Sequence, residues 1–360
     1  MTTSESVVPA DLTVGPLSAA PGARTRGTVR VDLGTTTVDV PVTLVNGARP
    51  GQRVVVTAGV HGGEFTGVDA AVRLGALLEP GEVRGQVVIC PVANPPAVYQ
   101  GRLGTSPLDG VNINRIFPGD PVGGPTERLA AWLFENLIGG AGAYVDLHSG
   151  GIDETLCDFV GYRICGDPEI DARTQWMAHA LGFDDVIVGL NADGGNSHAA
   201  AARQGVPAVL VETGQLGERD PAAARALVDG LHRLLHSLGV LDRSAGTEAA
   251  PPREWAWAGA VAAEAIGLWY PDFTAGDDVT SGQVIGRVID PADGREHKVT
   301  APATGRIFYG MRGLTVAPGT ELAAIAVPRD PDSLTPPPVP ANPHLPADPH
   351  LPSNPGPWNE

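Results

Sequence analysis

Residues 53–64 of this sequence, RVVVTAGVHGGE, decide the fold class. Their first part is an almost continuous apolar run that ends at a glycine, which is typical of a strand buried on both faces of a sheet. His61, two glycines and Glu64 follow at once, and a helical pattern, FTGVDAAVRLGALL, covers residues 65–78. The stretch therefore predicts a buried strand, a tight polar turn and a helix in direct succession.

Strands and helices continue to alternate on both sides of this stretch. The alternation favours an α/β fold with a mixed, mostly parallel sheet flanked by helices. The first 25 residues are rich in Pro, Ala, Ser and Thr and are expected to form a flexible N-terminal arm, so the α/β domain is placed at residues 26–245. Strands are predicted at 27–33, 38–45, 86–94, 143–151 and 206–214, and helices at 125–138, 168–181 and 221–240.

The pattern changes near residue 245. Short strands separated by turn signals dominate residues 251–328, which predicts a small all-β, sandwich-like domain. Residues 329–360 contain the near-repeat ANPHLPADPHLPSNP, and so much proline predicts a disordered, extended tail.

The composition excludes several classes of function. A formal net charge of −17 argues against nucleic-acid binding, which calls for clustered basic residues. The sequence has no apolar run of about 18 residues and its N-terminus does not resemble a secretory signal, so neither a membrane span nor export is expected. Three cysteines without a C-x-x-C pair fit a reducing compartment, and we expect a cytoplasmic protein. The oligomeric state stays open, including a homo-oligomer.

Three residues of metal-ligand type follow predicted strands. His61 and Glu64 flank two glycines, which permit a tight bend, and His148 lies where the strand in YVDLHSGG meets glycines. Any one such histidine is more often a hydrogen-bonded turn residue. Here, however, Glu212 also ends an apolar strand, and sites form at the carboxyl ends of strands in open α/β sheets. Two histidines and one glutamate are a ligand set for catalytic Zn²⁺ that leaves a position for water.

The segment RLGTSPLDGVNINRIFPGD, residues 102–120, supplies candidate substrate contacts. Asn112, Asn114 and Arg115 alternate with apolar residues and so share one face of an extended segment. Arg115 can hold a carboxylate with two hydrogen bonds. Arg102 is a second candidate cation, although a solvated loop arginine is an equally good interpretation of it.

A competing metal site would use His232 and His236, which lie four residues apart on one face of the last predicted helix. No glutamate of an H-E-x-x-H motif lies between them, and the surrounding LHRLLHSL is typical of an amphipathic helix. We therefore favour a structural role for this pair.

Four motifs occur in one order: HGGE at 61–64, NINRIFPG at 112–119, DLHSGG at 146–151 and VETG at 211–214. With them the sequence resembles the succinylglutamate desuccinylase/aspartoacylase family of the zinc carboxypeptidase-like superfamily, over roughly residues 25–330 and including the β-domain. The resemblance implies one Zn²⁺ per chain and a substrate with a carboxylate. The implied roles are zinc ligation by His61, Glu64 and His148, general acid–base catalysis by Glu212, carboxylate binding by Asn114 and Arg115, and carbonyl polarisation by Arg102.

The function expected from these motifs is zinc-dependent hydrolysis of the amide bond of a small N-acyl amino acid, such as N-acetyl-diaminobutyrate or an N-succinyl or N-acetyl amino acid. Two alternatives remain: a zinc carboxypeptidase that acts on a peptide C-terminus, and a non-catalytic binding protein on the same scaffold. A β-domain that narrows the cleft favours the small substrate. The presence of every ligand type together with Glu212 speaks against the binding protein. The family often places a tyrosine near the substrate, and Tyr99 and Tyr270 are the candidates.

Overall fold

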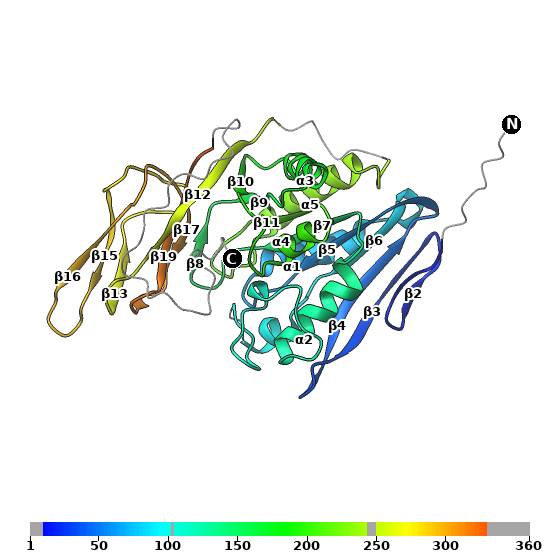
Figure 1. Ribbon diagram of the computed structural model, residues 1–360, viewed down its shortest axis with the longest axis horizontal. Helices are drawn as coiled ribbons and strands as arrows, with labels where there is room; N and C mark the ends of the chain where they lie inside the picture. The colour runs from blue at the N-terminus through cyan, green and yellow to red at the C-terminus, as the bar shows by residue number, and fades with distance from the viewer. Residues whose placement is uncertain (1–9, 102–103, 243–249, 330–360) are drawn as a thin grey trace.

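A mixed sheet of 13 strands runs through the protein, of which the computed structural model describes residues 10–101, 104–242 and 250–329. Its strands follow the order β14-β17-β19-β12-β10-β9-β11-β7-β5-β6-β4-β3, and β8 pairs with β17. Helices cover the α/β part of this sheet, and a second, smaller sheet faces its other end (Figure 1). The predicted mixed α/β class is confirmed.

Four parallel strands form the centre of the α/β domain. Their order is β6-β5-β7-β11, with bounds Arg84–Cys90, Arg49–Ala58, Ala143–His148 and Ala208–Glu212. Antiparallel strands extend the sheet at β3 (Ala23–Asp32), β4 (Thr37–Asn46) and β9 (Phe159–Arg163), while β10 (Asp185–Gly189) runs parallel to β9. Because β5, β7 and β11 are parallel neighbours, their carboxyl ends lie side by side.

Helices pack on both faces of the sheet. On one face α1 (Phe65–Leu77), α3 (Pro168–Ala180) and α5 (Pro221–Ser237) share a core with Val54 and Val56 of β5. On the other face α2 (Pro125–Leu133), continued by the π-turn η4 (Phe134–Ile138), and α4 (Ser197–Arg203) share a core with Val55. This alternation along one strand is why β5 is apolar on both faces from Val54 to Val56. None of the described helices has the length and apolar character needed to cross a membrane.

The predicted flexible arm is wrong for residues 12–25. β1 (Leu12–Val14) and β2 (Leu17–Ala19) form an antiparallel hairpin, and β3 already begins at Ala23. Leu12 and Val14 are buried against the α2 face of the sheet, and the buried Asn46 side chain donates to the carbonyl oxygens of Ala10 and Ala19 at 2.9 and 2.8 Å. Two apolar residues in a three-residue strand are too short a pattern to predict a strand from sequence.

The β-domain contains strands only, as predicted, but one of its two sheets is continuous with the sheet of the α/β domain. Its first strand, β12, pairs in parallel with β10 of the α/β domain, so the large sheet continues into it. The sheet β16-β15-β13-β18 packs on this extension. The predicted tail lies, from residue 330 on, outside the described residues. The strands are β12 (Arg253–Ala262), β13 (Gly267–Pro271), β14 (Asp278–Val279), β15 (Val284–Ile289), β16 (Glu296–Thr300), β17 (Gly305–Met311), β18 (Thr315–Val316) and β19 (Glu321–Pro328).

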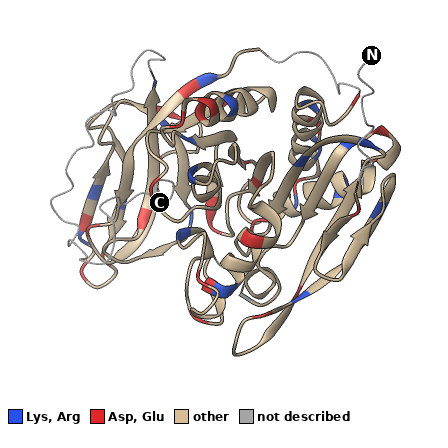
Figure 2. Ribbon diagram, turned by 45° about the vertical axis from the view of Figure 1, so that its right-hand side comes forward, with Lys and Arg blue, Asp and Glu red and all other residues tan. Residues whose placement is uncertain are grey.

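The junction between the two domains lies next to the central strand ends. β8 (Glu154–Leu156) follows β7 after a short turn and pairs with β17 of the β-domain. Phe159 of β9 meets Phe308 of β17 edge to face, with ring centroids 5.7 Å apart, and Trp255 packs on the same ring. Basic and acidic residues are distributed over both domains (Figure 2). The β-domain is thereby held against the edge of the sheet where the predicted site residues gather.

Candidate metal centre and active site

Three neighbouring strands deliver the predicted metal and acid–base residues. His148 and Glu212 are the last residues of β7 and β11 and lie directly opposite each other in the parallel ladder. His61 follows β5, the next strand, and Glu64 immediately precedes α1. Gly63 has φ +92°, a backbone conformation that side chains disfavour, so a glycine there allows the chain to turn from strand to helix.

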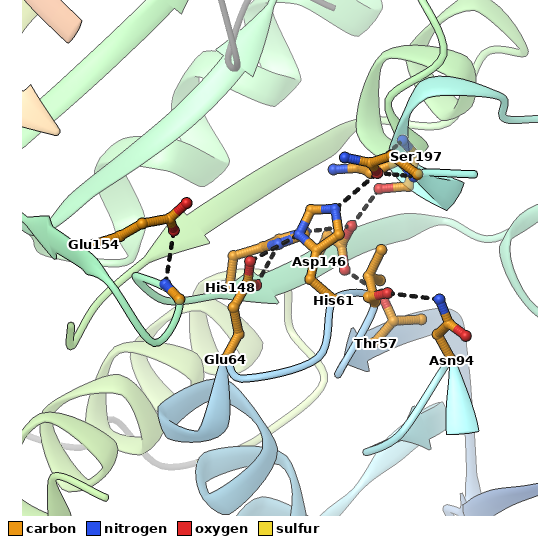
Figure 3. Close-up of polar contacts among 12 residues, drawn as sticks. Thr57, His61, Glu64, Asn94, Asp146, His148, Glu154 and Ser197 are labelled. Atoms are coloured by element: carbon orange, nitrogen blue, oxygen red, sulfur yellow. Dashed lines mark hydrogen bonds and ion pairs between the residues drawn. The ribbon is translucent and has the colours of Figure 1, made fainter. Parts of the chain in front are cut away.

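The Glu64 carboxylate lies between the two histidines (Figure 3). Its Oε1 is 2.7 Å from His61 Nδ1, and its Oε2 is 2.8 Å from His148 Nδ1. All three side chains are buried, and their ligand atoms lie within 4.8 Å of one another. The structure thus brings together the three predicted ligands in a group that one metal ion could join.

The charges of the two histidines keep the Glu64 carboxylate ionised. Burial by itself would raise the pKa of Glu64, but the two adjacent histidines hold that pKa well below its usual range. Burial would lower the pKa of His148, while Asp146 and Glu64 raise it well above its usual value. The carboxylate is therefore an anion at neutral pH and attracts positive charge to this position.

The outer nitrogens of both imidazoles are also held. His148 Nε2 lies 3.0 Å from Asp146 Oδ2, and His61 Nε2 lies 3.0 Å from Asn112 Oδ1. Asp146 accepts two further hydrogen bonds, from the Thr57 hydroxyl at 2.6 Å and from the Ser197 hydroxyl (Figure 3). Metal-binding histidines commonly donate their second N–H to such a group, which fixes tautomer and ring orientation.

Sequence reasoning missed Asp146, although a signal was present. It is the one charged residue in the apolar strand AYVDLH and stands two residues before His148, which places both side chains on the same face. A buried charge in such a strand needs partners, and the nearest candidate was the predicted ligand itself.

Glu212 is fully buried beside the three ligands. Neither of its carboxylate oxygens has a hydrogen-bond partner among the described residues. Burial raises the pKa of Glu212 well above its usual value, against the opposing effect of His148. An ionisable group buried in this way is costly unless it is used, and its position fits the predicted proton carrier.

The segment predicted to bind substrate packs against the same centre. Asn114, in the 3₁₀ turn η3 (Ile113–Arg115), is buried, and its Oδ1 accepts from the Ser197 backbone N–H at 2.9 Å. A Cβ on Gly195 would lie only 1.9 Å from the Arg115 carbonyl oxygen, so this close approach requires glycine. Arg115 is half-buried and donates to the Asn114 carbonyl at 3.1 Å. Arg102 lies outside the described residues.

Glu154 and Tyr309 form a contact between the site region and the β-domain that the sequence did not indicate. Glu154 Oε2 accepts from the backbone N–H of Gly151, the last residue of HSGG, at 2.7 Å (Figure 3). Tyr309, from β17 of the β-domain, donates its hydroxyl to Glu154 Oε1 at 3.4 Å. Of the tyrosine candidates, Tyr99 is largely exposed, and Tyr270 lies beneath Arg287 in the outer sheet.

The competing pair His232 and His236 lies on α5. Within the part of the chain that the structure describes, the only group of three or more ligand-type residues is His61, Glu64 and His148. The structure therefore favours the predicted group over the helical pair.

Comparison with known proteins assigns the chain to a family. Residues 50–238, more than half of the chain, match the model of the succinylglutamate desuccinylase/aspartoacylase catalytic domain. The N-alpha-acetyl-L-2,4-diaminobutyric acid deacetylase of Halomonas elongata is 34% identical over 257 residues, which cover 70% of this chain and 75% of that protein.

Solved structures agree at the level of the fold. A succinylglutamate desuccinylase/aspartoacylase from Rhodobacter sphaeroides superposes with a TM-score of 0.78 and 28% identity, covering 85% of this chain and 96% of that one. The product-bound ectoine utilization protein EutE of Ruegeria pomeroyi gives a TM-score of 0.79 at 23% identity, over 89% and 98% of the two chains. With the His-Glu-His group in place and the family model matching most of the α/β domain, the chain belongs to the succinylglutamate desuccinylase/aspartoacylase family.

Proposed function

We propose that His61, Glu64 and His148 hold one Zn²⁺ and that the protein hydrolyses the amide bond of a small N-acyl amino acid. One observation carries the proposal: the Glu64 carboxylate lies between the Nδ1 atoms of both histidines. The buried Glu212, whose oxygens accept no hydrogen bond from the described residues, lies opposite His148. Membership of a family whose named relative is a deacetylase makes the chain an enzyme of the deacylase class.

The donor set suits zinc. Two imidazole nitrogens and one carboxylate oxygen form a set that Zn²⁺ commonly takes in catalytic sites, with a position left for water or substrate. Asp146 and Asn112 fix the outer nitrogens of the two imidazoles, as metal-binding histidines require. When bound, the ion would polarise a carbonyl and make water a better nucleophile at neutral pH.

The protein's own residues then handle the protons. Glu212 accepts a proton from the attacking water and returns it to the amine that leaves, because an amine departs readily only when protonated. Since the described residues engage neither Glu212 oxygen, both are available for this transfer. Asn114 and Arg115 orient the substrate through its carboxylate, which brings the amide to the metal-binding group.

The position of the β-domain favours a small substrate over a polypeptide. β17 pairs with β8, and Tyr309 contacts Glu154 just beyond the turn that follows His148. A domain attached at this position narrows the approach to the centre. The relative from Halomonas elongata is named for an N-acetylated diamino acid, and we propose substrates of similar size here.

We also propose that the enzyme works in the cytoplasm. Cys90, Cys157 and Cys165 are all free thiols, and Cys90 is buried, which suits a compartment that keeps thiols reduced.

The test is a panel of N-acetyl and N-succinyl amino acids, each with its α-carboxamide counterpart, assayed with the zinc-loaded full chain. We expect hydrolysis of at least one free acid, a strong preference for it over the amide, and loss of most of that preference in Arg115→Ala. C-terminally blocked and free peptides in the same panel test the carboxypeptidase alternative. A wild type that cleaves peptides but no N-acyl amino acid would overturn the proposal.

A further inference from the structure

A small cavity lies beside the catalytic group, on the same face of the sheet. β9 runs antiparallel to β11, so that Phe159 is opposite Glu212 and Gly161 is opposite Leu210. Phe159, Gly161 and Leu210 line the cavity, which therefore begins next to the proposed proton carrier. Its volume is about 20 Å³, more than the roughly 10–15 Å³ that one water molecule needs but too little for a long side chain.

Arg163 brings a buried positive charge to this cavity. It stands two residues after Gly161 on β9, on the same face, and is only 4% exposed. Gly189 of β10 lies opposite it, and a Cβ there would be 2.3 Å from Arg163 Cδ, so that glycine makes room for the arginine. Burial and the charges of nearby Arg115 and Arg203, against the opposing effect of Asp193, lower the pKa of Arg163 to about 10, which still leaves a cation at neutral pH.

The other polar groups of the cavity are neutral. Asn196 Oδ1 accepts from Arg163 Nη2 at 3.2 Å and orients the guanidinium. His198 is buried, its Nδ1 has no hydrogen-bond partner among the described residues, and burial lowers its pKa to about 3, so that it is uncharged. No carboxylate is among the lining residues that the structure describes.

These features are those of an anion receptor. Apolar side chains of Phe159, Ile187, Leu210 and Trp257 make up much of the remaining lining. In such surroundings a hydrogen bond between a cation and an anion is stronger than in water. A carboxylate is small enough for the space and offers two oxygens to a guanidinium.

We propose that the Arg163 cavity, defined by Arg163, Asn196 and His198, receives a carboxylate of the substrate, and that Arg163 determines specificity together with Arg115. The inference rests on the proposed function, because it takes an N-acyl amino acid as the ligand. The bound group is either the α-carboxylate or a side-chain carboxylate of the substrate, since both offer two oxygens to a guanidinium. The cavity and Glu212 are neighbours on one face of the sheet, since Phe159, which lines the cavity, lies opposite Glu212.

The test compares acids with amides in the full, zinc-loaded chain. Substrates are the best N-acyl amino acid of the panel, its α-carboxamide, and an aspartate–asparagine pair with the same acyl group. In the wild type, kcat/KM for the recognised acid should exceed that for its amide by about 10- to 100-fold, as expected for a hydrogen bond to a charged group. Arg163→Met should reduce this ratio to near one while amide hydrolysis stays close to wild type, and Arg163→Lys should restore part of it. If replacing one carboxylate by an amide makes kcat/KM the same in the wild type and in Arg163→Met, that carboxylate is the one that Arg163 binds.

A matched control is Arg53→Met, which removes a half-buried arginine of the same sheet that donates to the Gly139 carbonyl. It should keep the wild-type ratio. Binding supplies a readout besides turnover: the product amino acid should raise the thermal unfolding midpoint of the wild type and of Arg53→Met, but not of Arg163→Met. Should Arg163→Met fail to fold, Arg163→Gln, which retains a donor toward Asn196, takes its place.

Two outcomes would overturn the inference: an unchanged acid-to-amide ratio in Arg163→Met, or an equal loss on acid and amide, which marks a merely structural role. The proposed function fails separately, if the wild type hydrolyses no N-acyl amino acid. In that case Arg163-dependent stabilisation by the free amino acid would still support a carboxylate site.

Discussion

Asp146 Oδ2 lies 3.0 Å from His148 Nε2, and both side chains are completely buried on one face of β7. Thr57 and Ser197 each donate a hydroxyl to the same carboxylate, so Asp146 is itself held in place. The imidazole is thereby oriented with Nδ1 toward Glu64, 2.8 Å away. The geometry makes Asp146 a positioning residue for the proposed metal site.

Asp146→Asn should therefore weaken zinc binding without abolishing it. Loss of such an outer partner typically costs about 10- to 100-fold in metal affinity. Competition with a chromophoric chelator measures the dissociation constant directly. Asp185→Asn is the matched control, since Asp185 is also a buried strand aspartate but bonds to Arg253 and Trp255. Equal zinc affinity in the wild type and Asp146→Asn would remove Asp146 from this role.

Zinc content should depend on His61 and His148. Each is one of three ligands, and its removal leaves too few donors for tight binding. Elemental analysis after dialysis should find about one zinc per chain in the wild type and strong loss in His61→Ala and His148→Ala. His232→Ala, on α5, should retain the metal. Stoichiometric zinc in the double variant His61→Ala/His148→Ala would show that the ion binds elsewhere.

Glu212→Gln should keep the metal and lose turnover. The substitution preserves shape but cannot carry the proton, and a general acid–base group is typically worth about 10²- to 10⁴-fold in rate. Steady-state kinetics and zinc analysis on the same preparation separate the two effects. Near-normal kcat would exclude Glu212 as the proton carrier, whereas joint loss of zinc and kcat would point to a ligand role.

The sequence predicted those site residues that are of metal-ligand or acid–base type and also stand at or just after the end of a strand. His61, His148 and Glu212 each end or follow an apolar run, so local pattern alone places them at one edge of a parallel sheet. Arg163 could not be predicted, because its importance comes from the antiparallel pairing of β9 with β11 and from glycines on neighbouring strands. Such register between distant segments leaves no local trace in the sequence.

Short length and pairing between distant segments explain the parts of the fold that the sequence did not predict. β9, β10 and α4 are five to seven residues long, too short for a clear period. The predicted break between two domains followed a real change of composition near residue 245. What the composition does not show is that β12 pairs with β10 and carries one sheet across that break.

Glu254, at the start of β12, connects this continuous sheet to a helix. Its carboxylate accepts from Gln175 Nε2 and lies 3.0 Å from His179 Nε2, both on α3, and it pairs with Arg329 just beyond β19 at 2.5 Å. The hydrogen bond from His179, followed by those from Gln175 and Arg329, lowers the pKa of Glu254 to about 2 in spite of its burial.

The stability contributed by Glu254 should consequently disappear in acid. A carboxyl whose pKa is lower in the folded chain stabilises the fold above its ordinary pKa, about 4.5, and loses that contribution as the pH falls toward 2. At pH 7, Glu254→Gln should lower the free energy of unfolding by about 1.5–3 kcal/mol, the range for hydrogen bonds to a charged group. Urea denaturation at pH 7, 5, 4 and 3 should show this difference from wild type constant down to about pH 5 and shrinking below it. Glu296→Gln, an exposed residue of β16, should match wild type throughout. A Glu254→Gln difference as large at pH 3 as at pH 7 would mean that the carboxylate's charge does not stabilise this junction.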